Sequence, residues 1–286
     1  MSIYRSKPSP FFEVRVQELD PFPTVTGLCA GYERGRWRAE ELGDYLFDYL
    51  AEFALSHSER EKFSHLTARR LMQAAAKSVY ETDKFAQRGE FGELMLHAVV
   101  RQLFDSEPAV SKIFYKSASN DTVKGFDAVH VVAPPEAELE LWLGEVKLYE
   151  DAKSAIRDVC SELRKHYDDG FLRSEFAVVA RYLDPSWEHA AALAALLDLN
   201  ASLDEIVRWI RVPVLVTYDS AVLASHTSSS EAYVAGFAEE IAGLHDYFKE
   251  RDLPAEILIH LLLVPLRSKR EFLATLDAKL RAWQAI

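Results

Sequence analysis

Three residues in the middle of the chain carry side chains that together can hydrolyse a phosphodiester: Asp127, Glu145 and Lys147. Asp127 opens one apolar, strand-like segment, and Glu145 and Lys147 stand near the end of the next. Because side chains alternate along a strand, Glu145 and Lys147 leave the same face. If a short turn brings Asp127 beside Glu145, the two carboxylates form an oxygen site suited to Mg²⁺. Lys147 on that face would orient and activate the attacking water.

The spacing alone does not distinguish a site from an ordinary ion pair. A Glu-x-Lys sequence at a strand end is often an exposed cross-strand pair, and it recurs by chance. Here both charges interrupt a strand that is otherwise apolar, where an isolated charge is costly unless it is paired or bound to metal. A further carboxylate, Glu93, stands at the start of the preceding predicted helix, with Glu90 as the weaker candidate. These features favour a site.

Basic residues also gather around these positions, and they include Lys116, Lys124 and Lys153. Such a patch can hold a nucleic-acid backbone. Acidic residues are interspersed with the later members, so an ordinary solvated surface is an equally good interpretation. A second basic cluster, at 267–270, is better explained as a cap on the last helix.

Several other chemistries lack their motifs. The sequence has no phosphate-cradling G-x-x-x-x-G-K-[ST] loop, and the GYERGR segment that begins at Gly31 has neither the spacing nor the lysine. There is no H-E-x-x-H zinc motif and no G-x-S-x-G serine nucleophile. Two cysteines, Cys29 and Cys160, are too few for a disulfide scaffold or a cysteine-built zinc site, and they suit a reducing cytosol.

The pattern of apolar residues predicts an α/β protein, with a mixed sheet flanked by helices and a helix-rich N-terminal region. Residues 11–32 are expected to form edge strands or an extended arm. Strands are predicted over 126–132, 140–147, 175–182, 212–218 and 257–264. Helices are predicted over 38–55, 58–79, 91–104, 151–167, 187–199, 231–249 and 269–283. The fold must therefore place the end of one strand beside the start of its neighbour.

Composition sets the broad class. The chain has 286 residues, of which 33 are Lys or Arg and 45 are Asp or Glu, so the formal net charge is −12. This charge argues against a protein that grips nucleic acid over its whole surface, although a local basic site remains compatible with it. No signal peptide and no membrane-spanning stretch is expected, and we expect a cytoplasmic protein with no membrane partner.

Three segments of the sequence resemble the HamA family. They are RGEFGELMLHAVV (88–100), KIFYKSASNDTVKGFDAVHVV (112–132) and LWLGEVKLYED (141–151). The combination of Lys-Gly-Phe-Asp with a following Gly-Glu-Val-Lys is a far more specific signal than Glu-x-Lys alone. HamA is the nuclease-type subunit of the Hachiman anti-phage defence system, and AbpA is a related defence protein. The close match spans 88–151.

The resemblance implies a restriction-endonuclease-like nuclease of the PD-(D/E)xK superfamily. In that family the Asp and Glu hold Mg²⁺ or Mn²⁺ and the Lys assists hydrolysis, which implies these roles for Asp127, Glu145 and Lys147. A helix glutamate found in many such nucleases would fall on Glu93. Phe126 stands where the broad motif has proline. The family also implies DNA as substrate and a HamB-like superfamily-2 helicase as a heterodimeric partner.

The predicted organisation has an N-terminal strand and helical region over 1–84 and a nuclease-like domain over 85–286. The helical pair within 38–79 is the expected helicase-binding surface. Two other functions stay open. The chain could be a catalytically inactive adaptor that keeps the nuclease fold to bind the helicase or DNA. It could also be a junction-cutting nuclease of the same fold, which normally needs a symmetric dimer.

Overall fold

The chain folds around one seven-stranded mixed sheet. The computed structural model describes residues 7–79, 89–111, 125–134, 138–198 and 200–286. The strands lie in the order β1 (Glu13–Glu18), β2 (Thr24–Cys29), β9 (Ile259–Leu266), β8 (Ile210–Asp219), β7 (Glu140–Leu148), β6 (Ala128–Val132) and β5 (Glu107–Val110). The four strands β2, β9, β8 and β7 run parallel, and the strands on both outer sides pair antiparallel.

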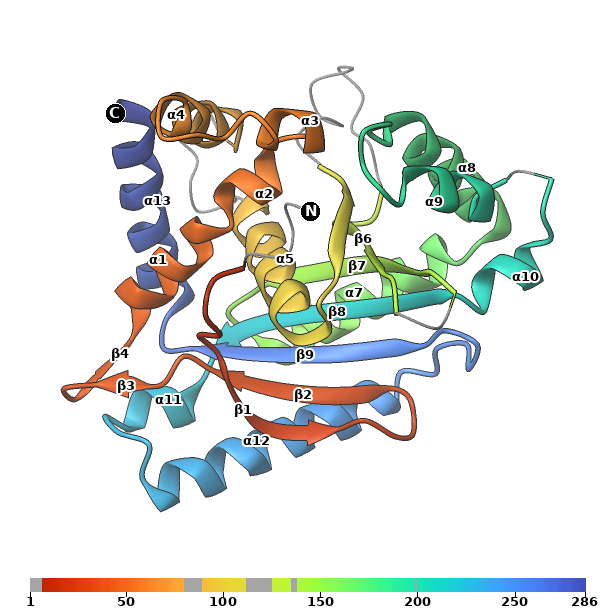
Figure 1. The fold of residues 1–286 in the computed structure, drawn as a ribbon. Helices are drawn as coiled ribbons and strands as arrows, with labels where there is room; N and C mark the ends of the chain where they lie inside the picture. The colour runs from red at the N-terminus through yellow and green to blue at the C-terminus, as the bar shows by residue number, and fades with distance from the viewer. Residues whose placement is uncertain (1–6, 80–88, 112–124, 135–137, 199) are drawn as a thin grey trace.

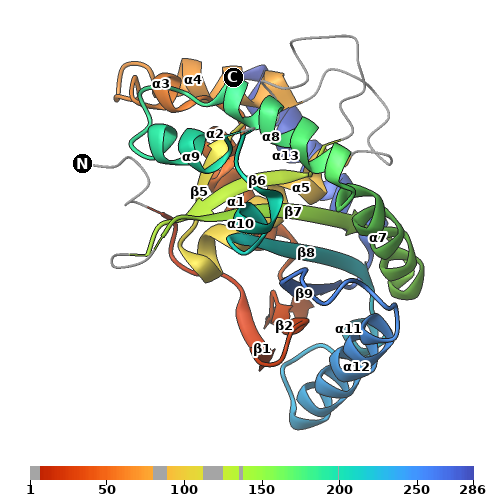
Figure 2. The same ribbon diagram turned by 90° about the vertical axis from the view of Figure 1, so that its right-hand side faces the viewer.

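Helices cover both faces of this sheet. Helix α5 (Glu90–Phe104) crosses in front of the strands and α7 (Ala152–His166) runs behind them (Figure 1). Helix α12 (Glu231–Lys249) lies next to α7 (Figure 2) and packs against β1 and β2, while α13 (Lys269–Ala285) packs against α1 (Ala39–Asp48) and α4 (Ala68–Val79). The remaining helices are α2 (Leu50–Ala54), α3 (His57–Arg60), α8 (Asp169–Tyr182), α9 (Ala190–Leu196), α10 (Leu203–Val207) and α11 (Ala221–Ser225).

The burial of the central strands explains this layering. Nearly all residues of β8 and β9 are buried, as expected for parallel strands that helices cover on both faces. Helix α5 approaches β7 so closely that a Cβ on Gly92 would lie 3.1 Å from Val146 Cγ2, and one on Gly144 would lie 2.9 Å from Leu96 Cδ2. Glycine at both positions therefore sets the distance between α5 and the strand that carries Glu145 and Lys147.

The predicted fold class, a mixed sheet flanked by helices, is confirmed. One predicted strand is wrong: residues 175–182 belong to helix α8. The side chain of Asp168 accepts hydrogen bonds from the backbone of Gly170 and Phe171 and so starts this helix. Its buried residues Leu172, Phe176 and Val179 follow helical spacing, although the apolar run EFAVVARY resembles a strand when read alone.

The N-terminal elements are more broken than the periodicity indicates. The helix predicted over 38–55 is interrupted at Tyr49, and the one over 58–79 is split into α3 and α4. Phe63 and Leu66, two large apolar residues within the predicted 58–79 helix, are 37% and 82% exposed. In the 11–32 segment only β1 is an edge strand, because β2 pairs with both β1 and β9. The short edge strand β5 was not predicted.

Strands β1 and β2, from the predicted N-terminal region, belong to the same sheet as the strands of the predicted C-terminal domain. The proposed boundary between residues 84 and 85 lies outside the described residues and stays a prediction. Among the helices that the structure describes, none combines the length and the apolar character needed to cross a membrane.

Candidate active site

Asp127 lies immediately before β6 and binds the backbone of β7 on both sides of Glu145. Its backbone N–H donates to the carbonyl oxygen of Gly144 (2.8 Å), and its Oδ2 accepts from the N–H of Val146 (3.0 Å). The structure therefore brings Asp127 beside Glu145, as the sequence predicts. Its charge acts on Glu145, because it contributes to the raised pKa of that carboxyl group.

Glu145 is a buried acid with a bound partner. Its residue is 2% exposed, and its Oε1 lies 2.7 Å from His166 Nδ1 on α7. Burial raises the pKa of Glu145 to about 7, the charge of Asp127 adds to the rise, and His166 and Lys147 oppose it. His166 is itself fixed between two rings, stacked on Phe171 at 4.3 Å and edge-on to Phe126 at 5.0 Å.

Lys147 leaves the same face of β7 as Glu145, as its two-residue spacing predicts. Its ammonium group donates to Glu162 on α7, one helical turn before His166. Burial favours the neutral amine, but the carboxylates of Glu162, Asp127 and Glu145 outweigh it and raise the pKa of Lys147. The amine is therefore held as a cation beside the acidic group.

Glu162 and His166 are the residues that sequence reasoning missed. They lie four apart on the helix that follows the Glu-x-Lys strand, so they share one helix face. This spacing is the available signal. A helix that packs behind the strand turns one of its faces toward Glu145 and Lys147, and two residues that lie four apart on that face can contact them. Nothing in the sequence says which pair it is.

Glu93 lies at the other side of the same strand end. It is 5% exposed on the first turn of α5, and it lines a pocket of about 400 Å³ together with Asp127, Val146 and Lys147. Lys269, at the start of α13, closes another side of this pocket. Glu90, the weaker candidate, is not among its lining residues.

The donor set suits a hard divalent cation, since it offers carboxylate oxygens around a pocket that water can enter. Mg²⁺ needs only one or two of them, because it keeps several waters. Glu93 and Asp127 line the pocket, whereas Glu145 is not among its lining residues and contacts His166 on α7, so the three carboxylates do not form one tight cluster. Among the described residues, the group of three whose ligand atoms all lie within 4.8 Å of one another is a different one.

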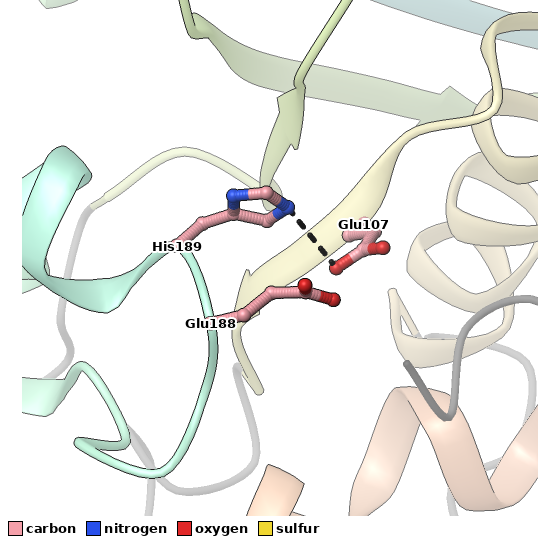
Figure 3. Close-up of side chains that lie close together, drawn as sticks. All are labelled: Glu107, Glu188 and His189. Carbon is pink, nitrogen blue, oxygen red and sulfur yellow. Dashed lines mark ion pairs between the residues drawn. The ribbon is translucent and has the colours of Figure 1, made fainter. Parts of the chain in front are cut away.

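That cluster consists of Glu107, Glu188 and His189 (Figure 3). It joins β5 to the segment before α9. The carboxylate of Glu107 already accepts from Trp187 Nε1 (3.0 Å) and pairs with His189 Nε2 (3.9 Å), and Glu188 is exposed. Contacts within the protein account for this cluster, which fastens the edge strand.

The three predicted nucleic-acid contacts have different outcomes. Lys116 and Lys124 lie outside the described residues. Lys153 is exposed on the first turn of α7, where its Nζ lies 5.2 Å from the centre of the Tyr247 ring. Its role in binding DNA stays a prediction.

Comparison with known proteins gives one family and one relative. The model of the HamA family matches residues 9–280. Anti-bacteriophage protein A of Escherichia coli (strain K12) is 23% identical over 261 residues, which are 87% of this chain and 46% of the relative. The chain thus spans about half the length of that curated relative. No solved structure matches it at a significant level. Because the family match covers nearly the whole sequence, the chain belongs to the HamA family.

Proposed function

We propose that this chain is a deoxyribonuclease dependent on Mg²⁺ or Mn²⁺, which acts in anti-phage defence together with a HamB-like superfamily-2 helicase. The observation that carries the activity is the strand end itself. Asp127 binds β7 on both sides of Glu145, and Lys147 stands on the same face as Glu145 at a pocket that Glu93 also lines.

In this mechanism the chain's own residues have separate tasks. Asp127 and Glu145, with Glu93 as a third carboxylate, would hold the metal, which when bound supplies Lewis-acid stabilisation of the phosphate. Lys147 is kept protonated by its acidic neighbours, and its positive charge stabilises the negative charge that develops on the phosphate. Glu162 and His166 hold Lys147 and Glu145 in place from behind.

The proposed defence role is supported by family membership, and the proposed helicase partner is supported by the net charge of the chain. Membership of the HamA family and the name of the Escherichia coli relative support a role against phage. With a formal net charge of −12 the chain is repelled by DNA at long range. A helicase that supplies the main DNA grip would therefore raise its activity and keep it controlled.

The test is plasmid cleavage with Mg²⁺, by the chain alone and with its helicase and ATP. We expect cleavage that increases with the helicase and is absent in the near-isosteric variant Glu145→Gln/Lys147→Met. The charge-matched control Glu239→Gln/Lys249→Met changes two exposed residues of α12 and should cleave normally. Absence of cleavage in every condition, with the helicase still bound, would favour the adaptor instead.

A further inference from the structure

A short arginine-bearing hairpin projects from the body of the protein (Figure 1). Strands β3 (Tyr32–Glu33) and β4 (Arg36–Trp37) pair antiparallel, and Arg34 and Gly35 connect them. Both connecting residues have positive φ, 49° and 77°, which is the pattern of a tight type I′ turn. Nothing lies within 4 Å of the space beside Gly35, so the tip is open on that side.

The residue at the tip is unusual for this turn. The left-handed conformation of the first connecting position favours Asn, Asp or Gly, and an arginine there is disfavoured. The backbone therefore gains nothing from Arg34. The turn exposes the side chain of Arg34 to solvent, and the side chain of Arg36 is exposed as well.

The base of the hairpin is fixed. Trp37 is 8% exposed and its ring meets that of Phe272 on α13 at 5.7 Å. The hydroxyl group of Tyr32 donates to the carbonyl oxygen of Leu223 (3.0 Å). A tip held in this way loses little conformational entropy when a ligand binds its arginines.

Four exposed arginines have no acidic partner. Within the part of the chain that the structure describes, no ion pair involves Arg34, Arg36, Arg267 or Arg270. Three glutamates, Glu33, Glu40 and Glu41, line the same surface hollow as Arg34 and Arg36. Of these, Glu40 is paired with Lys279 (3.1 Å).

These cations lead from the hairpin to the candidate active site. Arg267, at the end of β9, lies near enough to Tyr32 for its charge to act on that phenol. Two residues later Lys269 lines the pocket that contains Asp127 and Lys147. Residues 267–269 therefore connect the base of the hairpin, at Tyr32, to the pocket.

We propose that Arg34 and Arg36 of the β3–β4 hairpin, with Arg267 and Arg270, bind the phosphate backbone of a DNA strand and lead it past Lys269 into the pocket. Arginine suits this role because its planar fork bonds phosphate oxygens bidentately. The inference rests on the proposed nuclease function, which supplies the reason for DNA to enter the pocket.

The test measures DNA binding separately from cleavage. The full chain is titrated in EDTA onto a fluorescein-labelled oligonucleotide, single-stranded and duplex, over a range of salt concentrations. The Arg34→Ala/Arg36→Ala variant should bind more weakly, and the slope of log K against log salt should flatten by roughly 1.4 for single strands or 1.8 for duplex. The variant Arg34→Lys/Arg36→Lys, which keeps both charges, should bind DNA more tightly than the double alanine variant.

The control Arg70→Ala/Lys77→Ala removes the same charge from exposed positions on α4 and should bind as wild type. Equal affinity and slope in the hairpin variant, or no DNA binding by wild type, would overturn the proposal. The proposal would also be overturned if the hairpin variant bound DNA normally but no longer bound an acidic protein, because the hairpin would then recognise a protein and not DNA. Asp127→Asn tests the nuclease assignment alone: cleavage by this variant in Mg²⁺ would refute that assignment, while the binding result of the hairpin variant in EDTA decides the hairpin proposal.

Discussion

His166 Nδ1 lies 2.7 Å from Glu145 Oε1, and this contact joins the helix behind the sheet to the strand that carries the candidate active site. One turn earlier on the same helix, Glu162 accepts from the ammonium group of Lys147. Four residues of helix rise about 6 Å, and two residues of strand span about 6.6 Å. Helix α7 therefore matches the Glu-x-Lys spacing and positions both side chains at once.

The first prediction concerns Glu162. Glu162→Ala should lower the cleavage rate about tenfold, because Lys147 loses the partner that fixes its position. The loss should be smaller than that of Lys147→Ala. Since Glu162 helps to raise the pKa of Lys147, the alkaline limb of the pH–rate profile should move to lower pH. Glu162→Gln should restore part of the rate without restoring the profile, and an unchanged rate and profile in Glu162→Ala would contradict the positioning role.

Lys147 itself should be indispensable for cleavage. Lys147→Ala removes the cation at the pocket, and we expect a loss of about 10²-fold or more in the Mg²⁺-dependent rate. Circular dichroism and helicase co-purification should remain as in wild type, because the lysine is partly exposed at the strand end. Plasmid cleavage at the wild-type rate would remove Lys147 from the mechanism.

Sequence reasoning identified the strand end but not its support. Asp127, Glu145 and Lys147 are recognisable because charges in an apolar strand are rare, and strand periodicity fixes which side chains share a face. The residues that hold them, Glu162 and His166, depend on how α7 packs, which no local pattern encodes. The run 175–182 shows the same limit, because an apolar segment becomes helical when a cap such as that of α8 precedes it.

Divalent metal should stabilise the folded chain through Asp127. Mg²⁺ or Mn²⁺ at 100 times its dissociation constant adds about 2.7 kcal/mol to the free energy of unfolding. For a chain of this size the melting temperature should rise by several degrees. Asp127→Ala should abolish the shift, while Glu107→Gln, in the cluster at the edge strand, should leave it unchanged. Equal shifts in wild type and Asp127→Ala would place the metal elsewhere.

The last prediction concerns pH and stability. Burial, with a smaller contribution from Arg211, lowers the pKa of His260 to about 4. Its ring stacks on Trp142 at 5.0 Å, and its Nδ1 lies 2.9 Å from Thr24 Oγ1, so it fastens β9 to β7 and β2. The folded state therefore keeps His260 neutral where the unfolded chain, with an ordinary pKa near 6.5, already binds a proton.

The sign follows from this difference. The contribution of His260 to the free energy of unfolding is fully present above pH 6.5 and is lost as the pH falls toward 4. The loss amounts to about 2 kcal/mol after allowance for the partial exposure of the ring. Urea unfolding of wild type should therefore show stability that declines over this range, and His260→Gln should decline less steeply. Burial also lowers the pKa values of His97 and His130, so the stability of the variant should still decline with falling pH, but less than that of wild type. Parallel pH profiles for the two proteins would mean that His260 titrates alike in the folded and unfolded chains.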